Sequence, residues 1–225
     1  MDISYQGFAV KRVSLFCGHY GSGKTNIAVN YALGLKSLGL SVAIGDMDVV
    51  NPYFRTKDSE AELKNAGIDV ISLPFANSNV DLPSLPGEMY GLVQQKNRHA
   101  VFDVGGDDRG AFALGRYSPY ILEENDYNMF FVANFYRPLT KTADEAFEIM
   151  KEIELACKIP FTAIINNSNL GVETRAEDVE KTIETTKELS KMSGLPFAFV
   201  TADKGVAKEI KYDKVYSLKL QEKIF

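Results

Sequence analysis

The chain contains the octapeptide Gly18-His19-Tyr20-Gly21-Ser22-Gly23-Lys24-Thr25, a full match to the pattern G-x-x-x-x-G-K-[ST]. An apolar run from Ala9 to Cys17 precedes it and predicts a buried strand. From Thr25 to Leu38 apolar residues recur at helical spacing, which predicts a helix. A strand, a glycine-rich turn and a helix in this order are the context in which the pattern forms a phosphate-binding loop. The alternative is an ordinary glycine-rich turn.

The residue types of the octapeptide suit a bound polyphosphate. Its glycines let backbone N–H groups turn toward the phosphates, and the helix N-terminus adds the positive end of its dipole. Lys24 supplies a positive charge, and the Thr25 hydroxyl can bind Mg²⁺. We therefore expect nucleotide to be bound by Gly18, His19, Tyr20, Gly21, Ser22, Gly23, Lys24, Thr25 and Asn26.

Length and composition indicate one α/β domain spanning residues 1–225, because no linker rich in Pro, Gly, Ser or charge divides the chain. The formal net charge of -5 argues against nonspecific DNA binding through a basic face. The two cysteines lie far apart, so neither a disulfide framework nor an iron–sulfur cluster is indicated. Neither a leader segment nor a membrane-spanning apolar run is evident, so we expect a cytoplasmic protein.

Predicted strands and helices alternate along the chain, which is typical of a parallel sheet. The strands are expected near 13–17, 42–44, 70–73, 100–102, 129–133, 162–165 and 197–200. The helices between them are expected at 52–65, 111–122, 141–156 and 177–192. The pattern predicts a three-layer α/β fold of the P-loop NTPase type, with a mostly parallel sheet of about seven strands and helices on both faces.

Carboxylates follow two of these strands, at the sheet edge where such folds bind ligands. Asp46 and Asp48 follow the second strand, and Asp103 ends the fourth. We expect Asp103 to hold Mg²⁺ through water, with the Thr25 hydroxyl as a further ligand. One of Asp46 and Asp48 could hold a metal-bound water while the other orients the attacking water. Lys24, Asp46 and Asp48 are thus the expected catalytic residues. The alternative for Asp48 is that it caps the helix that Pro52 helps to begin.

Two glycines, Gly105 and Gly106, follow Asp103 and would allow the backbone to approach a γ-phosphate closely. This loop is therefore a candidate switch that responds to hydrolysis. We expect Asp107 and Asp108 to start the next helix rather than to bind metal.

These residues resemble the SIMIBI class of P-loop ATPases, the MinD/ParA/CobQ-CobB-like nucleotide-binding domains, over most of the chain. The resemblance implies that Asp46 and Asp48 serve the Mg²⁺ shell and the hydrolytic water, and that Asp103 is the Walker B acid. The stretch 164–169 is similar to the strand whose closing asparagine reads the base in that group, and 200–206 is similar to its second base-side loop.

Asn166 is the first choice for the base contact, and Asn167 and Asp203 are further candidates for nucleotide binding. An asparagine amide both donates and accepts, which suits recognition of adenine. The alternative for Asn167 and Ser168 is a simple turn after the strand. GTPases usually carry N-K-x-D here, and its absence favours ATP.

The sequence departs from the MinD/ParA pattern at one position. That group typically has a second lysine early in the loop, which reaches across a nucleotide-sandwich dimer, whereas this chain has His19 and Tyr20 there. Its absence puts such dimerisation and fast stimulated hydrolysis in doubt, since an added cation can be worth a factor of about 10³ to 10⁵. Arg55 is the favoured replacement if any cation takes this role, and the alternative is that Arg55 lies on the surface.

Three segments lie outside this chemistry. The first, 74–95, is expected to form a surface loop and a short helix that recognises a client or lines a second pocket. In the second, 134–138, we expect Phe135 to pack under the next helix, with stacking or partner anchoring beside Arg137 as the alternative. The third, 215–225, is expected to pack at the domain edge rather than attach to a membrane.

The sequence as a whole favours a Mg²⁺-dependent ATP-binding protein, a slow ATPase that acts as a nucleotide-state switch for an unknown protein partner in cofactor or metal-centre maturation. A homodimer is a further candidate assembly, and nothing indicates a nucleic-acid or membrane partner. The alternatives are an ATP-dependent metabolite enzyme, similar to dethiobiotin synthetase or a kinase, and a module that scarcely hydrolyses ATP.

Overall fold

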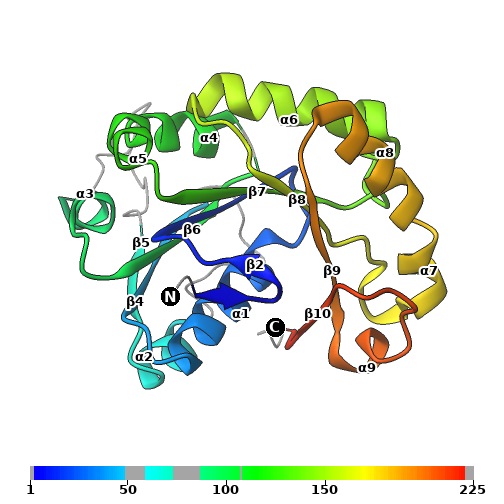
Figure 1. Ribbon diagram of the computed structural model, residues 1–225, viewed down its shortest axis with the longest axis horizontal. Coiled ribbons are helices and arrows are strands. Elements are labelled where there is room, and N and C mark those ends of the chain that lie inside the picture. The colour runs from blue at the N-terminus through cyan, green and yellow to red at the C-terminus, as the bar shows by residue number, and fades with distance from the viewer. Residues whose placement is uncertain (1–2, 49–58, 73–86, 107, 221–225) are drawn as a thin grey trace, which may run out of the picture.

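A parallel sheet of eight strands forms the centre of the molecule, in the order β10-β9-β8-β7-β3-β6-β4-β5 (Figure 1). The computed structural model describes residues 3–48, 59–72, 87–106 and 108–220. The strands are β3 (Val13–Cys17), β4 (Val42–Met47), β5 (Asp69–Ser72), β6 (His99–Val104), β7 (Tyr127–Ala133), β8 (Ala163–Asn166), β9 (Phe197–Asp203) and β10 (Val215–Leu218). All neighbours pair in parallel, so their carboxyl ends meet at one edge of the sheet.

Helices cover both faces of this sheet (Figure 1). The helices are α1 (Lys24–Ser37), α2 (Glu60–Asn65), α3 (Gly87–Gln94), α4 (Asp108–Gly115), α5 (Ser118–Glu124), α6 (Ala143–Cys157), α7 (Ala176–Glu180), α8 (Ile183–Ser193) and α9 (Lys204–Ala207). In Figure 1, α4, α6 and α8 lie along one side of the sheet and α1 and α2 along the other. The architecture therefore has three layers, as the sequence predicts.

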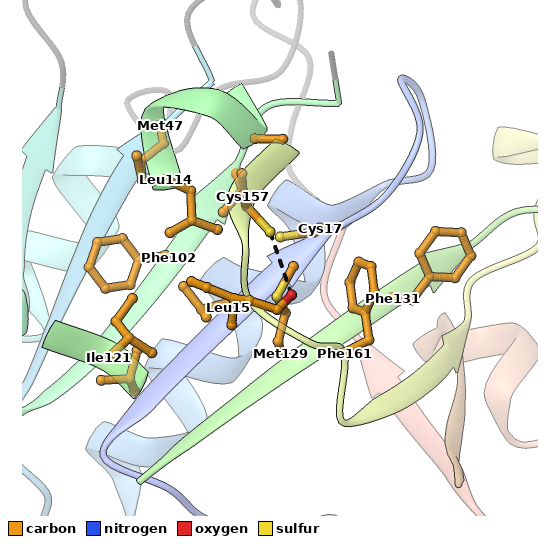
Figure 2. Packing of buried hydrophobic residues seen from close by; sticks show 14 of the residues in the cluster. Leu15, Cys17, Met47, Phe102, Leu114, Ile121, Met129, Phe131, Cys157 and Phe161 are labelled. Atoms are coloured by element: carbon orange, nitrogen blue, oxygen red, sulfur yellow. Dashed lines mark hydrogen bonds between the residues drawn. The ribbon is translucent and has the colours of Figure 1, made fainter. Parts of the chain in front are cut away.

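Side chains alternate between two cores along each central strand. In β3, Leu15 and Cys17 point into the core under α4 and α6, whereas Phe16 points into the core under α1. Figure 2 shows the first core, where Cys17 and Cys157 lie close together among apolar side chains. Burial raises the pKa of the Cys17 thiol well above its usual range and that of Cys157 to about 11. Both residues therefore serve as small apolar packing groups.

A two-stranded hairpin, β1 (Ser4–Tyr5) and β2 (Phe8–Ala9), closes the second core at the N-terminus. The hydroxyls of Tyr5 and Tyr216 lie 3.2 Å apart, which ties the hairpin to β10. Asn30 of α1 bonds the backbone N–H and carbonyl of Lys219 at 2.9 Å each. Both ends of the described chain are thus fastened around the helix that begins at the glycine-rich loop.

A buried ion pair connects the start of β3 to the helices α3 and α5. Arg12, just before β3, pairs with Glu124 at the end of α5, and its guanidinium also donates to the carbonyls of Leu92 and Val93 at 3.0 Å each. Arg12 is only 6 % exposed. A buried guanidinium is tolerated when its donors are satisfied in this way.

The seven expected strands are present, with bounds that differ by up to three residues, and residue 73 lies outside the described chain. Of the apolar run from Ala9 to Cys17, only Val13–Cys17 forms the buried strand, because Ala9 ends β2 instead. An eighth strand, β10, is added at the edge where the sequence indicates packing. The helix expected at 111–122 is instead two helices, α4 and α5, because Gly115 ends the first and Pro119 suits the first turn of the second. The stretch 177–192 likewise contains α7 and α8. Of the helix expected at 52–65, residues 52–58 lie outside the described part of the chain. None of the described helices is long and apolar enough to cross a membrane.

Candidate nucleotide-binding site

The octapeptide forms the connection between β3, a central strand, and α1, which begins at Lys24. Gly21 and Gly23 have φ of 74° and 84°, in the left-handed region that glycine adopts without strain. A Cβ on Gly23 would lie 2.2 Å from the Asn167 amide nitrogen, so only glycine fits there. The buried Ser22 hydroxyl has no hydrogen-bond partner in the described part of the chain. The loop thus follows a backbone path just before α1 that depends on glycine at Gly21 and Gly23.

Lys24 lies at the start of α1 with its side chain only 3 % exposed, and its Nζ is 3.7 Å from Asp48 Oδ2. The Asp48 backbone N–H donates to Asp46 Oδ1 at 3.0 Å, which fixes the turn after β4. Since an isolated buried charge is costly, Asp48 compensates Lys24 in this structure. An incoming phosphate would compete with Asp48 for the same ammonium group.

Two of the three expected metal-binding residues, Asp46 and Asp103, come together at this edge. Asp46 and Asp103 are opposite each other in the β4–β6 register, so their side chains share one face of the sheet. Both are buried, as is Thr25 in the first turn of α1. Among the described residues no group of three or more His, Cys, Asp or Glu side chains could hold a metal ion by itself. A Mg²⁺ ion there would complete its shell with phosphate and water oxygens, as it usually does.

The loop after β6 lies directly against the octapeptide. A Cβ on Gly106 would be 2.6 Å from the Tyr20 backbone nitrogen and 2.9 Å from the His19 carbonyl carbon. His19 bonds only locally in the described structure, through Nδ1 to the Tyr20 carbonyl at 3.0 Å, and Tyr20 is 48 % exposed. A shift of either loop would therefore move the other.

Asn166, the first choice for the base contact, is buried in the domain instead. Its amide nitrogen donates to the hydroxyls of Thr182 and Thr186, at 2.8 Å each, and its Oδ1 accepts the Ser168 N–H at 2.9 Å. Both amide hydrogens and the carbonyl oxygen are thus occupied by the protein. This geometry does not favour Asn166 as the residue that reads a base.

Asn167 connects the octapeptide to the neighbouring strands. Its amide donates to the Ser22 carbonyl at 2.6 Å, and its Oδ1 accepts the Thr201 hydroxyl of β9 at 2.6 Å. Asp203 ends β9, where its carboxylate accepts the Gly205 N–H at 2.9 Å and caps α9. A groove of about 450 Å³ beside Asp203 is lined by residues of α7 and α9.

Arg137, from the loop after β7, also reaches the octapeptide, which the sequence interpretation missed. Its Nε donates to the Gly21 carbonyl at 2.9 Å. One signal could have indicated this contact: Arg137 is a basic residue just after β7, which lies next to β3. Residues at such strand ends gather at the edge of the sheet where ligands bind. Phe135 in the same loop is buried in the core, which confirms its expected packing role.

Other expectations are tested only in part. Asp108 begins α4, which confirms its role at a helix start. Arg55, Pro52 and Asp107 lie outside the described residues, as does the loop expected before α3. The short helix expected near Gln95 is α3.

Comparison with solved structures finds the same fold in a signal recognition particle protein and in the signal recognition particle receptor FtsY. The FtsY structure from Thermotoga maritima superposes with a TM-score of 0.57 at 17% identity, over 84% of this chain and 61% of that one. FtsY from Elizabethkingia anophelis in complex with GDP superposes with a TM-score of 0.51 at 18% identity, over 84% of this chain and 56% of that one. The signal recognition particle 54 kDa protein from Aeropyrum pernix K1, in complex with GDP, superposes with a TM-score of 0.51 at 15% identity, over 84% of this chain and 40% of that one.

The chain thus spans at most about three fifths of the length of these structures. No family model matches the sequence, and no curated protein does. At such identities the similarity shows the fold, an α/β domain of the P-loop NTPase type, and the MinD/ParA resemblance is not confirmed.

Proposed function

We propose that this chain binds ATP with Mg²⁺ in the loop between β3 and α1 and hydrolyses it slowly, as a nucleotide-state switch for a protein partner. The observation that carries the proposal is Lys24, a buried ammonium group at a helix N-terminus, inside a glycine-rich loop and 3.7 Å from Asp48. A phosphate group placed there would meet backbone N–H groups, the helix dipole and a lysine together.

The order of the strands gives the site a direction. Asp46, Asp48 and Asp103 lie at the ends of β4 and β6, on one side of β3, whereas Asn167 and Thr201 lie on the β8–β9 side. Since Mg²⁺ bridges the terminal phosphates and requires carboxylates nearby, the β- and γ-phosphates belong on the β4–β6 side. The sugar and base then extend toward β8 and β9.

On that side, Asn167 replaces Asn166 as our candidate next to the base, with Asp203 as a second candidate. The sequence from Asn167 continues Ser168, Asn169, Leu170, so a lysine and an acid are absent at the N-K-x-D positions in this alignment as well. Since the acid of the N-K-x-D pattern, whose carboxylate would accept the guanine N–H groups, is missing from this stretch, we take adenine as the preferred base.

The contact of Gly106 with the octapeptide supports the switch. A loop that touches the backbone of Tyr20 would be displaced or retained according to whether a γ-phosphate is present. In the absence of the loop lysine typical of the MinD/ParA group, we expect slow turnover unless a partner supplies a cation.

Hydrolysis and base preference test this proposal in one set of measurements. We expect ATP to bind at least tenfold more tightly than GTP in the presence of Mg²⁺, and phosphate release to be slow and lost in Lys24→Ala. Lys191→Ala, which removes an exposed lysine of α8, is the matched control and should behave like the wild type. Equal affinity for GTP would contradict the base assignment, and release that depends on an added metabolite would favour a metabolite enzyme.

Size-exclusion chromatography with ADP and with a nonhydrolysable ATP analogue tests the assembly. A change in size with the ATP analogue alone would support a nucleotide-dependent homodimer. Identical monomer profiles, together with no protein captured differently in the two states, would contradict the switch.

A further inference from the structure

We propose that Arg137 binds the nucleotide at its α-phosphate and ribose, as a cation supplied within the same chain. The inference rests on the function proposed above, and it concerns a residue that neither the octapeptide nor the carboxylates include. It starts from one contact, in which Arg137 Nε donates to the Gly21 carbonyl at 2.9 Å.

The guanidinium lies close enough to the octapeptide to contact a ligand bound there. A Cβ built on Gly21 would lie 3.4 Å from Arg137 Nε and 3.7 Å from its Cζ. Only Nε is used in that contact, and a guanidinium carries five N–H donors in a rigid fork. No ion pair found among the described residues includes Arg137. The two terminal nitrogens therefore provide donors beside the loop.

The backbone around Arg137 is fixed before any ligand arrives. Its N–H donates to the Asn134 carbonyl at 3.1 Å, and its carbonyl accepts the Thr140 N–H at 3.2 Å. The Thr140 hydroxyl bonds the same Asn134 carbonyl at 2.7 Å, and the Phe135 N–H bonds the Ser168 hydroxyl at 3.1 Å. A side chain that is held in place loses less entropy when it binds.

The strand order decides which part of the nucleotide this cation meets. Arg137 follows β7, which lies on the opposite side of β3 from β6 and β4, where the three carboxylates are. The metal-bound terminal phosphates belong on the carboxylate side, so Arg137 approaches from the nucleoside side. A planar fork on that side suits the α-phosphate oxygens and the ribose.

Charge supports the same assignment. The described site contains Lys24 against Asp46, Asp48 and Asp103, so the protein side chains alone are net acidic. A triphosphate with one Mg²⁺ adds further negative charge. A guanidinium, which stays charged at any physiological pH, offsets part of this repulsion.

The test measures Kd for ATP and for ADP in the wild type, Arg137→Gln and Arg137→Lys, at low and high salt. We expect Arg137→Gln to weaken ATP and ADP by the same factor, about 10- to 100-fold, because both contain the α-phosphate. The affinity of Arg137→Gln should also depend less on salt, since a charge contact has been removed. Arg137→Lys should recover part of the affinity. Arg116→Gln, at an exposed arginine between α4 and α5, is the matched control.

Several outcomes would overturn the inference. Unchanged Kd in Arg137→Gln would remove Arg137 from the site. A loss confined to ATP would place the guanidinium at the γ-phosphate instead. A uniform loss with an unchanged salt dependence and no recovery in Arg137→Lys would assign it a structural role. If the wild type binds neither nucleotide, the proposed function fails; if the wild type binds and Arg137→Gln binds equally, only this inference fails.

Discussion

In this structure Lys24 is paired with Asp48, a carboxylate that would compete with a bound phosphate for the same ammonium group. Its ammonium group lies 3.7 Å from Asp48, and both side chains are 3 % exposed. If nucleotide binds as proposed, a phosphate replaces this carboxylate beside Lys24, so part of the binding free energy is used to break an existing pair. Asp48 would then be released toward the γ-phosphate, where a water-orienting carboxylate is required.

Asp48→Asn separates the two roles of this carboxylate. We expect the Kd of a nonhydrolysable ATP analogue to fall by about 3- to 10-fold, because the ion pair between Lys24 and residue 48 no longer has to be broken when the phosphate binds. Turnover should fall by about 100-fold or more, since the amide cannot activate water. Asp213→Asn, at an exposed aspartate, serves as the control. Weaker analogue binding by Asp48→Asn would show that Asp48 does not compete for Lys24.

Asn167, unlike Asn166, has a side-chain hydrogen bond to the octapeptide itself, so its substitution tests stability and nucleotide binding together. Asn167→Ala removes two hydrogen bonds, to the Ser22 carbonyl and from the Thr201 hydroxyl, and should lower the free energy of unfolding by about 1–3 kcal/mol. It should also weaken nucleotide binding, because Ser22 belongs to the binding loop. Thr201→Val removes the second bond, together with the longer 3.3 Å contact of the same hydroxyl with the Asn166 carbonyl, but keeps the bond to Ser22. We therefore expect a smaller effect in both chemical denaturation and calorimetry. Equal effects of the two variants would argue against the Ser22 contact as the important one.

The loops after β3 and β6 act as one element, because Gly106 lies against the backbone of Tyr20. Neither loop can move freely while the other stays in place, which is how a change at the terminal phosphate would reach α4. The contact involves backbone atoms, so it cannot be relieved by a side-chain rotation.

Gly106→Ala tests this coupling. Its Cβ would lie 2.6 Å from the Tyr20 nitrogen, so we expect the loops to separate and Kd for ATP to weaken by about tenfold or more. Gly91→Ala, in the middle of α3 and 3.6 Å from a flexible glutamine side chain, is the matched control. That change should leave Kd unaltered and raise stability by up to about 1 kcal/mol. Wild-type affinity in Gly106→Ala would show that the loops are not coupled.

Across the whole molecule, the pair of Arg12 and Glu124 connects the central strand to α5 and to the end of α3. Glu124→Gln should lower the free energy of unfolding by about 3–5 kcal/mol, because Arg12 would remain buried without its anion. Glu148→Gln breaks an exposed pair on α6 and should change it by less than about 1 kcal/mol. Equilibrium denaturation measures both, and similar small values would show that water compensates Arg12.

Features that depend on residues close together in the sequence could be predicted. Features that depend on which strand ends lie side by side in the sheet could not. The octapeptide, its flanking strand and helix, and Asp103 at the end of β6 are local patterns, and all lie where expected. The choice between Asn166 and Asn167 depends on which way a side chain points as β8 ends, and a shift of one residue reverses that direction. The register between β8 and β9 does shift at Ile164 and Ile165, which no local pattern reveals.

Arg137 shows the same limit. It is 116 residues from Gly21 in the chain, and only the adjacency of β7 and β3 brings the two together. The edge strand β10 was also harder to predict, because its four residues alternate between buried and exposed positions and follow a charged stretch. Its place was indicated only as packing at the domain edge.

The central claim is that the loop from Gly18 to Thr25 binds a nucleoside polyphosphate through Lys24, and calorimetric titration with ATP and Mg²⁺ tests it most directly. The account predicts saturable one-to-one binding that is weakened by about 100-fold or more in Lys24→Ala and unchanged in Lys191→Ala. Absence of heat in the wild type at millimolar ATP, or equal affinity in wild type and Lys24→Ala, would contradict it.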